Sequence, residues 1–121
     1  MNSNDMKVRT KAFAHRCVKL AAALPSSMLG KHLGHQLIRS ATSVAANYRA
    51  ACVAQSIAVF TSKVSIAYEE SDESYFWIEF ILDEKMVDKK RIYPLLMEAD
   101  ELTKILAASR KTSSKNKRRN S

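Results

Sequence analysis

Apolar residues recur every three or four positions through most of this chain, which is the spacing of one face of an α-helix. The clearest run is residues 56–83, which contain neither glycine nor proline. One line along this run can face a core, and it consists of Ile57, Phe60, Val64, Ala67, Ser71, Ser74, Ile78 and Leu82. A second line lies on a different face, and it consists of Val59, Lys63, Ile66, Glu70, Glu73, Trp77 and Phe80.

This second line permits two interpretations. It is either part of a wide core stripe with some exposed apolar residues, which are common on protein surfaces, or an interface that packs against another copy of the chain. The second interpretation predicts a homo-oligomer whose interface contains these seven residues.

Similar spacing predicts three further helices, so that four are expected at about 7–24, 31–53, 56–83 and 90–109. Pro25 stops the first helix and Ser56 is a suitable N-cap for the third. In the fourth helix the expected inward residues are Ile92, Leu95, Leu96, Ala99, Leu102 and Leu106. Four helices with short links predict an all-α protein, an antiparallel up-down-up-down four-helix bundle spanning residues 1–109.

Composition and charge add a distinct C-terminal segment. Only two glycines and two prolines occur among 121 residues, which suits an all-α fold. Residues 110–121 lack apolar side chains and are expected to form a disordered basic tail. The formal charge is +8, but residues 1–65 hold nine Lys or Arg and one acid, whereas residues 66–108 hold eleven acids and five Lys or Arg. Such asymmetry suits an anionic partner or head-to-tail packing of subunits.

The chain offers no recognisable catalytic or metal-binding pattern. Di-metal sites of four-helix bundles need Glu and His three residues apart on each of two helices, but Glu70-xx-Glu73 and Glu98-xx-Glu101 contain no histidine. His32 and His35 are better explained as loop or first-turn residues than as metal ligands. We therefore expect no enzyme activity, no cofactor and no small-molecule substrate.

The two cysteines and the absence of a long apolar segment bear on location. Cys17 and Cys52 lie on separate predicted helices and are most simply small core residues of a reducing compartment. No apolar run approaches the roughly 20 residues of a membrane span, and the first residues lack a signal-peptide core. The expectation is a cytoplasmic protein that does not enter a membrane.

The paired glutamates leave one question open. If Glu70, Glu73, Glu98 and Glu101 face inward they need partners, because a buried unpaired carboxylate is costly. Arg39 and Lys63 are the candidate partners, in the same chain or across a subunit boundary. Alternatively the glutamates are simply solvated.

Three ordered segments give the chain a family resemblance. They are Gln36-Leu37-Ile38-Arg39-Ser40 with Ser43 and Asn47, then Glu70-xx-Glu73 with Trp77-Ile78, and finally Glu98-xx-Glu101-Leu102. Together they resemble the bacterial 23S rRNA intervening-sequence proteins over about residues 7–112. The chain departs from many relatives at Val53 and Gln55, where basic residues are common, and at Ala46, where glycine is common.

The resemblance implies an antiparallel four-helix bundle that assembles as a ring-like homopentamer without enzymatic activity. The chain is also similar to the accessory subunit of diversity-generating retroelements, a pentamer that binds nucleic acid and a reverse transcriptase. The residues matching the recurring family positions are expected to be mainly structural, and they are Arg39, Ser43, Asn47, Glu70, Glu73, Trp77, Glu98 and Glu101.

These observations favour a non-enzymatic oligomer that binds the backbone of RNA or DNA, because phosphates attract cations without regard to sequence. The candidate contacts on the body are Lys7, Arg9, Lys11, Arg16, Lys19, Lys31 and Arg49, and those in the tail are Arg110, Lys111, Lys115, Lys117, Arg118 and Arg119. Most of the nine aromatic residues fall on core stripes, so no base-stacking platform is expected. The alternative is a protein-interaction scaffold or accessory subunit with no nucleic-acid contact.

Overall fold

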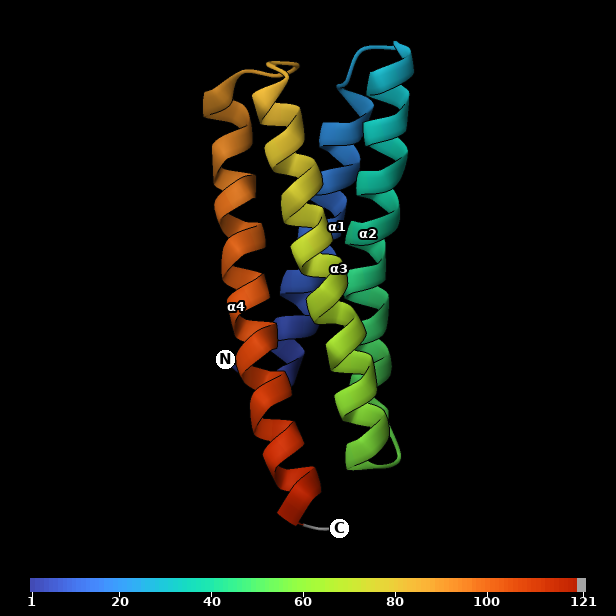
Figure 1. The fold of residues 1–121 in the computed structure, drawn as a ribbon, viewed down its shortest axis with the longest axis vertical. Coiled ribbons are helices and arrows are strands. Elements are labelled where there is room, and N and C mark those ends of the chain that lie inside the picture. Colours follow the sequence, from blue (N-terminus) through green and yellow to red (C-terminus); the bar gives the residue numbers. More distant parts are fainter. Residues whose placement is uncertain (120–121) are drawn as a thin grey trace.

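Four long helices pack side by side in an antiparallel bundle (Figure 1). The computed structural model describes residues 1–119, and its helices are α1 (Ser3–Ala22), α2 (Met28–Cys52), α3 (Ile57–Asp83) and α4 (Lys89–Arg119). Each helix packs against the next along the chain, and α1 closes the bundle against α4 through a smaller contact. The up-down-up-down four-helix bundle expected from the apolar spacing is confirmed.

Side chains at the helix beginnings explain where the helices start. Asn2 and Asp5 form a capping box, in which the backbone N–H of Asp5 donates to Asn2 Oδ1 at 2.8 Å, so α1 begins four residues before the expected position. Ser27 caps α2 through the N–H of Gly30 at 3.0 Å. Ser56 caps α3 as expected, since its hydroxyl accepts from the N–H of Val59 at 3.1 Å.

The fourth helix is longer than the sequence pattern indicates. Its end was expected at residue 109, but α4 continues to Arg119, so residues 110–119 of the expected tail are helical in the structure. Two contacts with α3 hold this extension: the hydroxyls of Ser113 and Thr61 meet, and the guanidinium of Arg110 stacks 4.6 Å above the ring of Tyr68. The last two residues of the expected tail lie outside the described part of the chain.

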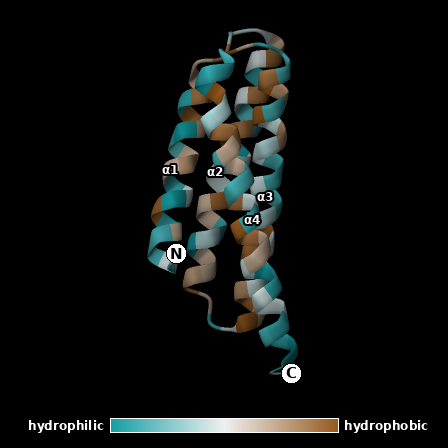
Figure 2. Ribbon diagram, turned by 90° about the vertical axis from the view of Figure 1, so that its left-hand side faces the viewer, coloured by the Kyte–Doolittle hydropathy of each residue, from teal (hydrophilic) through white to brown (hydrophobic). Residues whose placement is uncertain are grey.

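The core follows most of the expected faces, and it includes a group of buried hydroxyls. On α3 the expectation was wrong for Ile57, which is exposed because it lies in the first turn at the open end of the bundle, whereas Ile81 is buried although it lies off the expected line. All six α4 residues expected to face inward are buried. The Ser74 hydroxyl donates to that of Ser40 at 2.9 Å, and the hydroxyls of Ser71 and Thr103 lie 2.8 Å apart. Every buried polar side-chain atom within residues 1–119 has a partner, so these small residues bring α2, α3 and α4 close together without a desolvation cost. In Figure 2 the last turns of α4, near the C-terminus, are hydrophilic.

Candidate nucleic-acid interface

The carboxylates of α3 hold Arg39 of α2. Arg39 Nη1 donates to Glu70 Oε2 at 3.1 Å, Nη2 contacts the carboxylate of Glu73, and Nε donates to Gln36 Oε1 at 3.1 Å. Trp77 Nε1 donates to Glu73 Oε2 at 2.9 Å. The expected pairing of Glu70 and Glu73 with Arg39 therefore occurs within one chain, whereas Lys63 takes no part in the ion pairs of the described residues.

The second pair of glutamates holds an arginine that the sequence assigned to nucleic acid. Arg9 Nε and Nη2 donate to the two carboxylate oxygens of Glu98 at 2.8 and 2.7 Å, and Nη2 also lies 3.1 Å from Glu101 Oε1. The hydrogen bonds that Arg9 donates to Glu98 raise the pKa of Arg9 above its ordinary value. Arg9 thus joins α1 to α4, and its guanidinium is engaged inside the chain rather than available to a phosphate.

Other residues of the motifs that carry the family resemblance also form contacts within the chain. Ser40 lies in the buried hydroxyl pair with Ser74, and Asn47 Nδ2 donates to the carbonyl oxygen and the hydroxyl of Ser43 at 3.0 and 2.9 Å. These contacts agree with the expectation that the recurring residues are mainly structural. The Ser40–Ser74 hydrogen bond joins α2 to α3, whereas the contacts of Asn47 stay within α2.

The predicted interface stripe of α3 lies at the junction with α2. Its residues Glu70, Glu73 and Trp77 are engaged there, and the Trp77 ring meets His32 edge-on with centroids 5.8 Å apart. Lys63 and Ile66 are half-buried, and Val59 is exposed. Phe80 of the predicted stripe is exposed as well, beside Phe76, which lies outside the stripe. We call these two residues the aromatic ridge; they are 37 % and 49 % exposed, and their ring centroids lie 6.0 Å apart.

A groove rimmed by cations runs between α1 and α2. Its apolar floor contains Val8, Ala14, Val18, Ala45 and Ala46, and its rim carries Lys7, Lys11, His15, Thr42 and Arg49. Its volume is about 610 Å³ and no carboxylate lines it. Four of the sequence-predicted contacts for nucleic acid therefore face solvent in two places: Lys7, Lys11 and Arg49 gather at this groove, while Lys31 lies apart near the start of α2.

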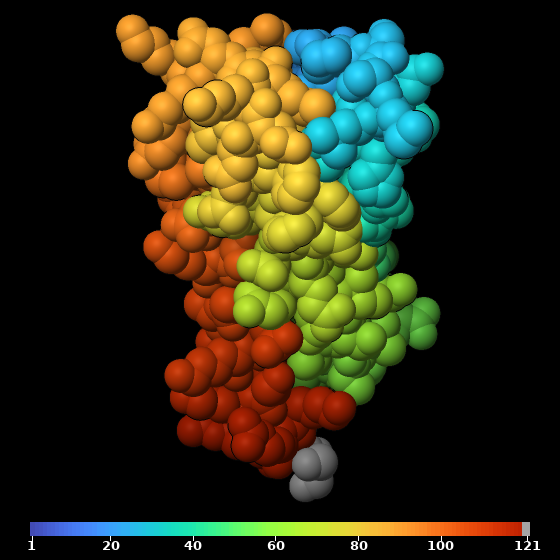
Figure 3. Space-filling model, turned by 45° about the horizontal axis from the view of Figure 1, so that its top comes forward, coloured from blue at the N-terminus to red at the C-terminus, as the bar shows by residue number. Residues whose placement is uncertain are grey.

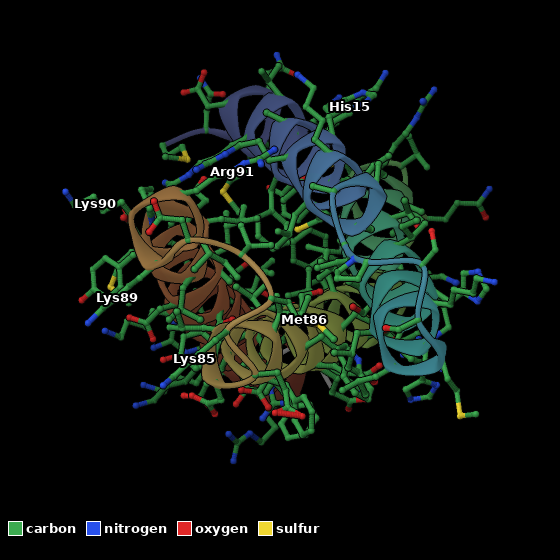
Figure 4. The ribbon with its side chains drawn as sticks, turned by 90° about the horizontal axis from the view of Figure 1, so that it is seen from above. His15, Lys85, Met86, Lys89, Lys90 and Arg91 are labelled. Carbon is green, nitrogen blue, oxygen red and sulfur yellow. The ribbon has the colours of Figure 1, made fainter. Side chains whose placement is uncertain are left out.

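Arg16 and Lys19 lie on the other side of α1, where they meet residues that the sequence reasoning did not include. They line a shallow cleft with Arg91 of α4. Looking down the bundle, Figure 4 shows Lys89 and Lys90 pointing away from the axis and Arg91 on the side nearer α1. The DKKR run at 88–91 was the available signal, but only the fold brings it beside the end of α1.

The remaining predicted cations lie on the last turns of α4. Lys111, Lys115, Lys117, Arg118 and Arg119 are exposed, whereas Arg110 is half-buried over Tyr68. The last turns of α4 therefore present these cations on a helix in the structure. Within residues 1–119 no group of three or more His, Cys, Asp or Glu side chains could hold a metal ion. None of the four helices has the length and apolar content to cross a bilayer.

Comparison with known proteins agrees with this architecture. The family model of the 23S rRNA-intervening sequence protein matches residues 3–108. A crystal structure of a protein with unknown function from the S23 ribosomal protein family of Bacteroides thetaiotaomicron superposes with a TM-score of 0.83 at 31 % sequence identity. The match covers 92 % of this chain and 99 % of that one. No curated protein matches the chain.

Proposed function

Since the chain belongs to the family of 23S rRNA-intervening sequence proteins, we propose that it is a non-enzymatic, homo-oligomeric four-helix bundle protein that binds the phosphate backbone of RNA or DNA. The structural relative is described as a protein with unknown function. The proposal therefore depends on the surface chemistry of this chain.

The observation that supports it most strongly is that only two of the cations of α1 and α2 form ion pairs. The carboxylates of α3 and α4 engage Arg9 and Arg39. The six other cations of α1 and α2 have no ion pair within the described residues: Lys7, Lys11, Arg16, Lys19, Lys31 and Arg49. The only acid of α1 is Asp5, and α2 has none. These unpaired cations keep their full attraction for a polyanion.

The number of free cations predicts the salt dependence. Six phosphate contacts would give a slope of about −5.4 for the logarithm of the association constant against the logarithm of salt concentration, at about −0.9 for each neutralised phosphate of a duplex. Because no base edge is read in this mode, duplexes of different sequence should bind alike.

The test is fluorescence anisotropy with labelled duplex RNA and DNA over a salt series. Lys11→Gln/Lys19→Gln should reduce the magnitude of the slope by about 2. The matched control, Lys63→Gln/Lys104→Gln, removes the same charge from α3 and α4 and should leave the slope unchanged. Absence of binding at low salt, or an equal effect of both variants, would overturn the proposal.

The homo-oligomeric part draws support from the aromatic ridge, because an apolar patch of this kind on a surface otherwise rich in charge is typical of a protein contact. The family resemblance implies a pentamer, which for a 13.6 kDa chain would have a mass of about 68 kDa. Native mass spectrometry or light scattering measures this mass directly. Phe76→Ser/Phe80→Ser should reduce it to that of one chain, and a wild-type monomer at high concentration would contradict this part.

The alternative is a protein-interaction scaffold or accessory subunit, which the same ridge also favours. Capture from nuclease-treated lysate separates the two functions. A partner that stays bound after nuclease treatment, and is lost in the Phe76→Ser/Phe80→Ser variant, supports the scaffold.

A further inference from the structure

A cleft lies between the last turns of α4 and the beginning of α3. It is at the end of the bundle where α4 continues past the beginning of α1, as Figure 1 shows. In Figure 3 the red end of α4 borders the green beginning of α3 at this end of the molecule. The cleft measures about 740 Å³ and is open to solvent. Its walls are Ala54, Gln55 and Ser56 of the turn before α3, Ile57 and Phe60 of α3, and Ala108, Ser109, Thr112, Ser113 and Asn116 of α4.

The lining of this cleft is neutral, partly apolar and partly able to form hydrogen bonds. Phe60 and Ile57 supply apolar surface, and the Ile57 side chain is 37 % exposed. Three polar side chains in the walls, Gln55, Thr112 and Asn116, form no hydrogen bond within residues 1–119. Two free amides thus face the same space as an aromatic ring, and no charged residue is among the lining residues.

Positive charge surrounds the cleft instead of lining it. Lys111 and Lys115 are exposed on α4, each directly preceding a lining residue. Ser56 is the N-cap of α3, so the positive end of that helix dipole also lies at the cleft. A ligand that suits these features has a neutral flat group carrying donors and acceptors, attached to a negatively charged chain.

We infer that the cleft binds an unpaired nucleobase of a single-stranded nucleic acid, with the flanking phosphates on Lys111 and Lys115. The base would stack on Phe60, and the amides of Gln55 and Asn116 would reach its edge. Adenine is the best match, because Asn and Gln amides pair with its adjacent acceptor and amino group. This inference rests on the proposed binding of nucleic acid and adds base contact to backbone contact. It also differs from the sequence expectation, which placed Phe60 only in the core.

A base inside a duplex cannot enter such a cleft, which separates this site from the backbone contacts of α1. Stacking of a base on an aromatic side chain is worth about 1–3 kcal/mol, or about 5- to 150-fold in affinity. The cleft therefore predicts a preference for single strands with bases over the same backbone without them.

The experiment compares three labelled probes at low salt by anisotropy: a short oligoadenylate RNA, an abasic strand of equal length, and a duplex. Wild type should bind oligoadenylate about tenfold more tightly than the abasic strand. Phe60→Leu should reduce that preference at least about fivefold while leaving duplex binding unchanged. Tyr93→Leu, which alters an exposed ring near the other end of α4, is the matched control and should keep the preference. Asn116→Ala, at an exposed position, provides a second test that does not disturb the core.

Equal binding of oligoadenylate and the abasic strand would overturn the inference, as would equal behaviour of the Phe60 and Tyr93 variants with no effect of Asn116→Ala. Duplex binding would then persist, so the proposed backbone binding would stand. Loss of binding to all three probes by wild type would overturn both.

Discussion

The two arginines held by glutamates offer a direct test of how burial sets the value of an ion pair. Arg9 and Glu98 expose 20 % and 18 % of their side chains, and two parallel hydrogen bonds join them. Arg39 exposes 48 %, and its partner Glu70 exposes 20 %. Hydrogen bonds to charged groups contribute about 1.5–3 kcal/mol where water is largely excluded, whereas exposed pairs contribute about 0.2–1 kcal/mol.

Replacing each arginine by methionine removes the charge and keeps most of the apolar stem. We expect Arg9→Met to lower the free energy of unfolding by about 2–3 kcal/mol, because it also leaves a partly buried carboxylate without a partner. Arg39→Met should cost about 1 kcal/mol or less, since water replaces the lost donors. Urea unfolding followed by circular dichroism measures both values.

A double-mutant cycle with Glu98→Gln separates the interaction from other effects of the substitution. The Arg9–Glu98 coupling should be about 1–2 kcal/mol and should persist at high salt, whereas an Arg39–Glu70 cycle should give less than about 1 kcal/mol and decline with salt. Equal costs, or a larger cost at Arg39, would refute the reasoning from exposure. That result would mean that the α2–α3 surface is shielded from water in solution.

Two further predictions concern the glycines and the cysteines. Gly30→Ala should lower the free energy of unfolding by about 1–3 kcal/mol, because a Cβ there collides with the carbonyl of Pro25. Gly34→Ala should raise it by about 0.5–1 kcal/mol, since the nearest neighbour of the added Cβ is Ala21 Cβ at 3.6 Å. Thermal melts of both variants measure the two effects, and a stabilised Gly30→Ala variant would contradict the prediction. Burial raises the pKa of the Cys17 thiol from 9.0 to about 12. The thiol therefore ionises at lower pH in the unfolded chain than in the folded one, so the free energy of unfolding should decline from about pH 9 to about 12. The Cys17→Ala variant should not show this decline. In the native protein Ellman's reagent should label Cys52 ahead of Cys17, and two rapidly reacting thiols would contradict the buried position.

The helices of this fold were predictable because each carries its own periodic signal. The inward residues of α4 repeat over four turns, and every one of them is buried. The end of α4 carried no such signal, since residues 110–119 lack apolar side chains. Their helix depends on Ser113 meeting Thr61, a contact between positions 52 residues apart, which local patterns do not encode.

The candidate surfaces were predictable only in outline. Arg9 and Lys11 look alike in the sequence, yet Arg9 is bound by Glu98, 89 residues away, and Lys11 is free. Arg39 was one of two candidate partners, with Lys63, because buried glutamates need a cation, and only the fold shows that Arg39 is the one that pairs. The cleft beside Phe60 could not be foreseen, because it lies where α4 extends beyond the beginning of α1.

Together, the charges and the helix lengths divide the molecule into regions with separate physical roles. The acids of α3 and α4 satisfy the two arginines that hold neighbouring helices together, which leaves the other cations of α1 without partners. The surplus length of α4 does two things at once: it adds exposed cations and creates a neutral cleft between them and α3. A polyanion attracted to this end would therefore meet a place for an uncharged base beside its phosphates. That arrangement requires the extension to remain helical, because an unfolded tail would supply the charges but no cleft. Hydrogen exchange of residues 110–119 slower than that of an unstructured peptide is thus the condition on which base recognition depends.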